Sequence, residues 1–136
     1  MPFEDEPTEQ IDNSIFSLYV RENKKKFDKF IIKAKKQNKK IFLYGASTKG
    51  NTLLQYYNIN SKVIPFAAER SPEKWGKYTI GTGIEIISEK EARKHNPDYF
   101  FVMPYAFIKE FQKRELKWLK SGGKFLLPYP TFRVVK

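Results

Sequence analysis

The 136-residue sequence contains no cysteine and only one histidine, His95. Without cysteine the chain forms no disulfide, has no thiol nucleophile and builds no thiolate metal site, and a single histidine leaves a metal centre without its usual ligands. His95 stands beside the Asn-Pro-Asp turn at 96–98, which predicts a solvent-facing residue with no catalytic role. The sequence also shows no Ser/His/Asp set and no obvious carboxylate pair. These absences favour a binding function over a catalytic one.

The sequence also lacks an apolar run of about 20 residues, the length that a membrane span needs. Its acidic first residues do not resemble a signal peptide, so we expect a cytoplasmic protein without membrane contacts. Acidic residues are few, because 15 Asp and Glu stand against 26 Lys and Arg, a net charge of +11. This balance favours anionic partners such as nucleotides, sugar phosphates, nucleic acid or an acidic protein surface.

The central feature of the chain is a strand–turn–helix junction. The apolar run 41–44 is too short for a helix, and a turn rich in glycine and hydroxyl side chains leads from it into a helix over 49–58. In an open α/β sheet, free backbone N–H groups and the positive end of the helix face the crevice at such a junction. The residues that we expect to bind an anion here are Gly45, Ser47, Thr48, Lys49, Gly50, Asn51 and Thr52.

This turn matches two phosphate-binding motifs only in part. Gly45 and Gly50 have the outer spacing of G-x-G-x-x-G, but Ser47 replaces the middle glycine, which keeps the turn and adds a hydroxyl donor. The P-loop pattern fails at Asn51, which stands where its lysine should be, so ATP hydrolysis is disfavoured. Two interpretations remain at this point: a phosphate site, or a turn in which Ser47 or Thr48 only caps the helix.

Hydrophobic patterning predicts alternating helices and strands over the rest of the chain. Residues 1–13 are acidic and show no periodicity, which indicates a flexible tail or the remnant of a linker. A long lysine-rich helix over 14–38 is expected to form an arm before an α/β body over 39–136. The expected strands and helices of the body are strands 41–44, 62–68, 84–87, 99–103 and 124–128, a short edge strand 132–135, and helices 49–58, 88–95 and 107–120. This alternation predicts an α/β fold with a mostly parallel sheet of about five strands.

Parallel strands bring the residues at their carboxyl ends to one edge of a sheet. Glu69 lies about as far beyond Gly45 as the carboxylate that binds ribose in dinucleotide folds, although an ordinary surface glutamate would look the same. The loop 71–83 combines glycines, lysines and aromatic residues, which either bind phosphate, base and sugar or pin the loop to the body. We therefore expect one crevice formed by 45–52, 69–77 and 104–107. Its further binding residues are Glu69, Arg70, Lys74, Lys77, Tyr78 and Tyr105.

Four motifs in order resemble a known family. They are Tyr44-Gly-Ala-Ser-Thr-Lys-Gly-Asn-Thr-Leu-Leu54, Pro72-Glu-Lys-Trp-Gly-Lys-Tyr-Thr79 with Gly81-Thr82-Gly83, Pro97-Asp-Tyr99, and Gly122-Gly-Lys-Phe125 with Pro128 and Pro130. Over residues 14–136 the chain resembles the C-terminal domain of the SAM-dependent C-methyltransferases, which act on nucleotide-linked deoxysugars and related substrates. The resemblance implies a single Rossmann-like, three-layer domain that holds the nucleotide sugar facing the SAM site.

In that family a zinc-binding domain and a SAM-binding methyltransferase domain precede this one. The sequence has neither the zinc cysteines nor a SAM motif, so the chain alone is expected to hold no cofactor and to transfer no methyl group. The resemblance instead implies SAM in a partner or missing methyltransferase domain, present in cis or in trans. Ile80, Gly83 and the run Tyr105-Ala106-Phe107 depart from residues that the family often has, and these departures leave the identity of the sugar open.

Two other functions remain compatible with the sequence. A nucleotide- or CoA-binding regulatory module would use the same turn at 45–50. A nucleic-acid-binding protein would use the net charge of +11, but the lysines are spread along one helix and several loops, which weakens this interpretation.

Overall fold

A six-stranded sheet forms the centre of the protein. The computed structural model describes residues 9–46, 54–102, 107–128 and 132–136, with the backbone alone for 9–17, 19 and 20. The sheet has the order β3-β2-β1-β4-β5-β6, in which β1 to β5 run parallel and β6 runs antiparallel to β5. The strands are β1 (Ile41–Tyr44), β2 (Phe66–Glu69), β3 (Glu85–Ser88), β4 (Tyr99–Val102), β5 (Lys124–Leu127) and β6 (Arg133–Val135). The predicted α/β fold is confirmed, and the predicted edge strand joins the sheet as β6.

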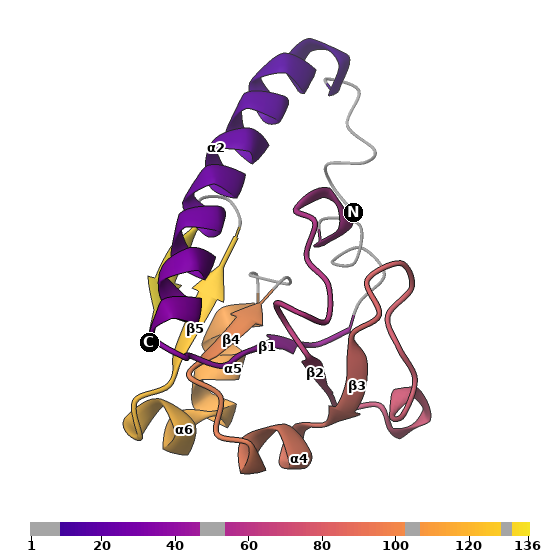
Figure 1. Ribbon diagram of the computed structural model, residues 1–136, viewed down its shortest axis with the longest axis vertical. Helices are drawn as coiled ribbons and strands as arrows, with labels where there is room; N and C mark the ends of the chain where they lie inside the picture. Colours follow the sequence, from indigo (N-terminus) through magenta and orange to yellow (C-terminus); the bar gives the residue numbers. More distant parts are fainter. Residues whose placement is uncertain (1–8, 47–53, 103–106, 129–131) are drawn as a thin grey trace.

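Helices cover both faces of this sheet (Figure 1). The helical elements are α2 (Glu9–Lys36), the 3₁₀ turn η1 (Pro72–Lys74), α4 (Glu89–Lys94), α5 (Ile108–Arg114) and α6 (Leu116–Lys120), with a further helical turn at 54–56. Successive residues of a strand point to opposite faces, so the fully apolar β1 contributes to two cores. Its Leu43 packs in the core that includes Phe27 of α2, and its Tyr44 packs in the core that includes Trp118 of α6. The result is the three-layer arrangement that the resemblance implied.

The long helix α2 begins at Glu9 rather than at Ser14 and ends at Lys36. The acidic residues near its start favour an earlier beginning, because the N-terminal end of a helix attracts negative charge. Its C-terminal half packs on the sheet through an apolar stripe, in which Phe27 and Ala34 are buried. The N-terminal half of α2 extends beyond the sheet (Figure 1).

Two further predicted elements differ from the structure. The second strand starts at Phe66 instead of Lys62, because residues 61–63 form a turn and Pro65 has no N–H to give to a ladder. The helix predicted over 107–120 is two helices, α5 and α6, which are separated at Glu115 with φ −105° and ψ 26°. The apolar periodicity of this region did not reveal the break, and Leu116, which it places on the inward face, is 52% exposed.

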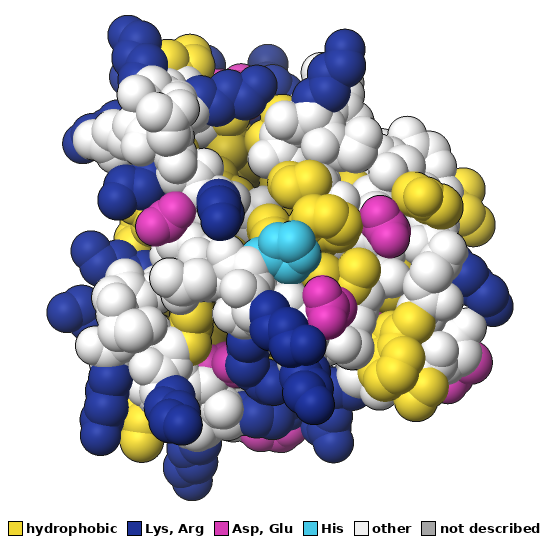
Figure 2. Space-filling view, turned by 60° about the horizontal axis from the view of Figure 1, so that its bottom comes forward, with side chains coloured by type: hydrophobic (Ala, Val, Ile, Leu, Met, Phe, Trp, Pro, Cys, Tyr) yellow, Lys and Arg dark blue, Asp and Glu magenta, His cyan; other side chains and the backbone are white. Residues whose placement is uncertain are grey.

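The face that carries α4 has no single basic stripe. Figure 2 shows Lys and Arg side chains distributed around this face, with hydrophobic side chains around the histidine near its centre. His95 is exposed, as predicted, and its ring lies 5.1 Å from that of Phe66 and 5.6 Å from that of Phe42, between ring centroids. Within the described part of the chain, no helix combines the length and the apolar character needed to cross a membrane.

Ser88 caps the start of α4, because its hydroxyl accepts a hydrogen bond of 3.0 Å from the Glu91 N–H. We expect Ser88→Ala to lower the free energy of unfolding by about 1 kcal/mol, since the helix N-terminus would lose this partner. Urea denaturation measures the change, with Ser61→Ala in an exposed turn as the matched control. Equal stability losses in the two variants would contradict a capping role for Ser88.

Candidate functional site

The candidate site lies where the strand order of the sheet changes direction. β2 and β3 follow on one side of β1, whereas β4, β5 and β6 lie on the other. In open α/β sheets, ligands bind in the crevice outside the carboxyl ends of the strands at such a switch point. The carboxyl end of β1 is Tyr44, which is followed at once by Gly45. The switch point therefore lies at the edge of the sheet where the sequence predicts the binding crevice.

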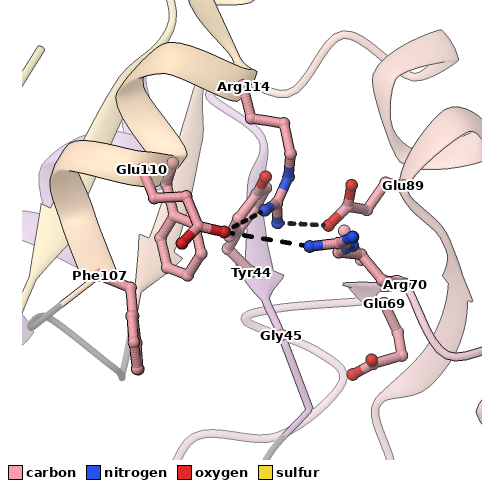
Figure 3. A pocket seen from close by; sticks show the side chains of 10 residues that line it. Tyr44, Gly45, Glu69, Arg70, Glu89, Phe107, Glu110 and Arg114 are labelled. Carbon is pink, nitrogen blue, oxygen red and sulfur yellow. Dashed lines mark hydrogen bonds and ion pairs between the residues drawn. The ribbon is translucent and has the colours of Figure 1, made fainter.

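A hollow of about 300 Å³ opens at this edge (Figure 3). The strand side of the hollow consists of Tyr44, Gly45, Ala68, Glu69, Arg70 and Glu89. The helix side consists of Phe107, Glu110, Phe111 and Arg114, from α5 and the residue before it. The hollow thus brings together three of the predicted binding residues, Gly45, Glu69 and Arg70, and faces them with side chains of α5.

The chain leaves β1 through a fixed backbone turn. Gly45 has a φ of +89°, a left-handed conformation that a residue with a Cβ rarely adopts, and its N–H donates a hydrogen bond of 2.7 Å to the Ala68 carbonyl. The next N–H, that of Ala46, donates to Glu69 Oε1 at 3.0 Å. Lys74 Nζ approaches the Ala46 carbonyl at 3.4 Å. The exits of β1 and β2 are therefore tied to each other.

Glu69 fixes both of these exits. Its second oxygen, Oε2, accepts a hydrogen bond of 3.0 Å from the Ser71 N–H, and its backbone carbonyl accepts one of 2.8 Å from the indole of Trp75. Each carboxylate oxygen of Glu69 thus already holds a backbone donor. This bracing role is a feature that the sequence did not reveal, and the proposed contact of Glu69 with ribose stays a prediction.

Beneath the hollow, a buried carboxylate joins α5 and α6 to β1 and α4. Glu115, at the break between the helices, is 2% exposed. The Tyr44 hydroxyl donates to its Oε2 at 2.6 Å, and Arg93 donates to both of its oxygens at 2.8 and 2.6 Å. The only sign of this network in the sequence is a glutamate on an otherwise apolar helix face. A carboxylate on such a face becomes buried, and a buried carboxylate needs polar partners.

The comparison with protein families identifies the family of the chain. The model of the C-methyltransferase C-terminal domain family matches residues 8–130. The chain belongs to this family. It is also 35% identical over 92 residues to the C-methyltransferase NovU of Streptomyces niveus, a match that covers 68% of this chain and 22% of NovU. The chain thus spans about a fifth of the length of this relative, and the resemblance inferred from the four sequence motifs is confirmed.

In this C-methyltransferase C-terminal domain, a chain of ion pairs runs from the buried network to the hollow. Arg114 donates to Glu89 Oε2 and to Glu110 Oε2, both at 3.0 Å. Its guanidinium lies 5.6 Å from the ring centroid of Tyr44, within the range of a cation–π contact. Arg70 reaches Glu110 across the mouth of the hollow at 4.0 Å. The described residues of the hollow therefore include three carboxylates and two guanidinium groups.

Burial and pairing set the charge states of this network. Burial would raise the pKa of Glu115, but the hydrogen bonds from Arg93 and Tyr44 outweigh it and hold that pKa below its usual value. Burial, together with the hydrogen bond to Glu115, raises the pKa of the Tyr44 hydroxyl well above its usual range. The hydrogen bond to Glu115 raises the pKa of Arg93. At neutral pH the C-methyltransferase C-terminal domain thus holds an ionised Glu115 and a protonated Tyr44.

Other predicted binding residues lie away from the hollow or outside the described residues. Lys77 and Tyr78 belong to a segment that runs along the outer edge of β3, where the Lys77 carbonyl accepts from the Ile86 N–H at 2.8 Å and Tyr78 forms a bridge with Glu85. Neither residue lines the hollow, and the Tyr78 side chain is exposed. The residues that fall outside the described part of the chain are Ser47, Thr48, Lys49, Gly50, Asn51, Thr52 and Tyr105.

Proposed function

We propose that this domain binds a nucleotide-linked sugar for a SAM-dependent C-methyltransferase. The observation that carries the proposal is the hollow at the switch point of the sheet, where Gly45, Glu69 and Arg70 converge with α5. Family membership supports a role within a C-methyltransferase. A crevice outside the carboxyl ends of parallel strands is the common place for a nucleotide in folds of this kind.

In this proposal the diphosphate binds at the turn that begins with Gly45. The left-handed conformation of Gly45 turns the chain sharply at the end of β1, as a phosphate-binding turn requires. Arg70 and Lys74 supply positive charge beside it, since Arg70 lines the hollow and the Lys74 amine approaches Ala46. The groups that would hold the phosphates are the side chains of Ser47, Thr48 and Lys49 and the N–H groups of Gly50, Asn51 and Thr52.

The methyl donor would come from another domain. We propose that a SAM-binding methyltransferase domain, in cis or in trans, acts on the sugar that this domain presents, and that this domain does not transfer methyl groups alone. The match covers only 22% of NovU, so most of that C-methyltransferase lies outside the matched region. This supports a separate domain for the methyl donor. The net charge of +11 is consistent with an anionic ligand.

Calorimetric titration of the chain tests the proposal. The probes are dTDP, GDP, CDP, NADH and CoA at about physiological salt. We expect saturable binding of a nucleoside diphosphate and a loss of at least about tenfold in affinity for the double variant Ser47→Ala/Lys49→Ala, because charge-assisted hydrogen bonds to phosphate would be removed. The matched control is Ser61→Ala/Lys62→Ala, in an exposed turn at the other end of β2.

The same titrations separate the alternatives. A double variant that binds nucleoside diphosphates as tightly as the wild type would defeat the proposed phosphate site. Binding of NADH or CoA without binding of any nucleoside diphosphate would favour a regulatory module. Nucleic-acid binding would show as an affinity for a DNA duplex whose logarithm falls steeply and linearly with the logarithm of the salt concentration.

A further inference from the structure

The three described carboxylates of the hollow differ in how many of their oxygens already accept a hydrogen bond from the protein. Glu69 holds a backbone N–H on each oxygen. Glu89 holds Arg93 on one oxygen and Arg114 on the other, and its side chain is 14% exposed. Both oxygens of Glu69 and both oxygens of Glu89 therefore already have partners within the domain.

Glu110 is the accessible carboxylate. Its side chain is 60% exposed, and its Oε2 receives Arg114 at 3.0 Å and lies 4.0 Å from Arg70. Figure 3 shows Glu110 and Arg70 facing each other across the hollow. Among the described residues no partner is recorded for the other oxygen, Oε1, so Glu110 retains capacity to accept hydrogen bonds.

The charge balance of the hollow selects hydroxyl groups over phosphates. Among the described residues, three carboxylates against two guanidinium groups give the lining an excess of negative charge, which opposes a diphosphate beside them. Carboxylates accept hydrogen bonds from hydroxyl groups, and guanidinium groups donate to them. Phe107 adds an apolar wall that is 56% exposed and suits the carbon face of a sugar ring. These features together fit a hydroxylated ring.

We propose that Glu110 accepts hydrogen bonds from the hydroxyl groups of a sugar ring. This inference rests on the proposed function, in which the diphosphate binds at the neighbouring turn after Gly45. The ring is either the ribose of the nucleotide or the hexose linked to it. Glu110 thereby takes the role that the sequence had suggested for Glu69.

The geometry of α5 prepares Glu110 for this role. Arg114 lies one helical turn after Glu110, and their ion pair holds the carboxylate toward the hollow. The pair with Arg70 is long, and the Arg70 side chain is 65% exposed. Exposed ion pairs contribute little to stability, so a ligand hydroxyl can replace Arg70 beside Glu110 at small cost.

Calorimetry of the full chain with dUDP, UDP and UDP-glucose tests the inference. UDP adds the ribose 2′-hydroxyl to dUDP, and UDP-glucose adds a hexose to UDP, so the two gains in affinity identify the ring. We expect the wild type to show at least one of these two gains. In Glu110→Ala the affinity for the probe that shows the gain is expected to fall about tenfold, whereas the affinity for dUDP changes little. The matched control is Glu22→Ala on α2, where the side chain is 63% exposed.

The outcomes separate this inference from the proposed function. If Glu110→Ala keeps both gains, or if dUDP, UDP and UDP-glucose bind equally to the wild type, the role of Glu110 is overturned while the diphosphate site stands. If the wild type binds none of these three probes and none of dTDP, GDP and CDP, the proposed function is overturned and the inference with it. Urea midpoints of both variants close to that of the wild type would show that folding does not explain a lost gain.

Discussion

Replacing Glu115 by glutamine is expected to lower the free energy of unfolding by about 3 kcal/mol, because it removes one partner of a buried ion pair. In the wild type both oxygens of Glu115 accept from Arg93, and one also accepts from the Tyr44 hydroxyl. Glutamine has one acceptor oxygen, and its amide donors would face the donors of Arg93. The side chain of Glu115 is 1% exposed, so water cannot supply the missing acceptor.

Urea denaturation at neutral pH measures this loss, with the slope of the transition checked for constancy. Glu22→Gln makes the same chemical change at an exposed position of α2 and is expected to stay within about 0.5 kcal/mol of the wild type. If Glu115→Gln were to stay in the same range as this control, the buried network would not be a source of stability.

The pH dependence of stability gives a second readout of the same variant. The pKa of Glu115 is lower in the folded protein than its ordinary value of 4.5, so its stabilising contribution is complete above that pH. The contribution is lost as the pH falls through the folded pKa. The difference in stability between the wild type and Glu115→Gln is therefore expected to shrink below about pH 4.5. A difference that stays constant into acid would show that the charge of Glu115 is not involved.

The fold was predictable wherever local pattern and global topology agree. The run at 41–44 is too short for a helix and fully apolar, and it becomes the central strand β1, buried on both faces. The helix predicted over 88–95 corresponds to α4, whose N-cap is Ser88. The break at Glu115 was not predictable from helix periodicity, because it depends on Arg93 and Tyr44, which are far from it in the sequence.

The candidate site was predictable to the extent that it follows from strand ends. Gly45, Glu69 and Arg70 meet at the hollow because they follow neighbouring parallel strands. Glu110 was missed because it lies within a helix, where an exposed glutamate one turn before an arginine reads as an ordinary surface ion pair. Lys77 and Tyr78 were assigned to the site on composition alone, and the path of their loop along β3 places them elsewhere.

Gly123→Ala is expected to lower the free energy of unfolding by about 3 kcal/mol, through steric overlap in a packed core. A Cβ at this position would overlap Cδ2, Cε2 and Cζ2 of the Trp118 indole. The indole is held in place, because its Nε1 donates to the Pro97 carbonyl at 2.8 Å and its ring packs against Phe100 and Phe125, with centroids at 4.6 and 5.2 Å. Urea denaturation measures the loss.

A double-mutant cycle with Trp118→Leu identifies the cause. The smaller side chain leaves room for the added methyl group, so Gly123→Ala is expected to cost much less in the Trp118→Leu background. Additive losses would show that the indole is not what excludes a side chain at this position. Trp118 belongs to α6, which only Glu115 separates from α5, so the contact of the indole with Gly123 lies close in the chain to the buried network and to the helix that carries Arg114 and Glu110. The absence of a side chain at Gly123 therefore helps to position the helix side of the proposed sugar site.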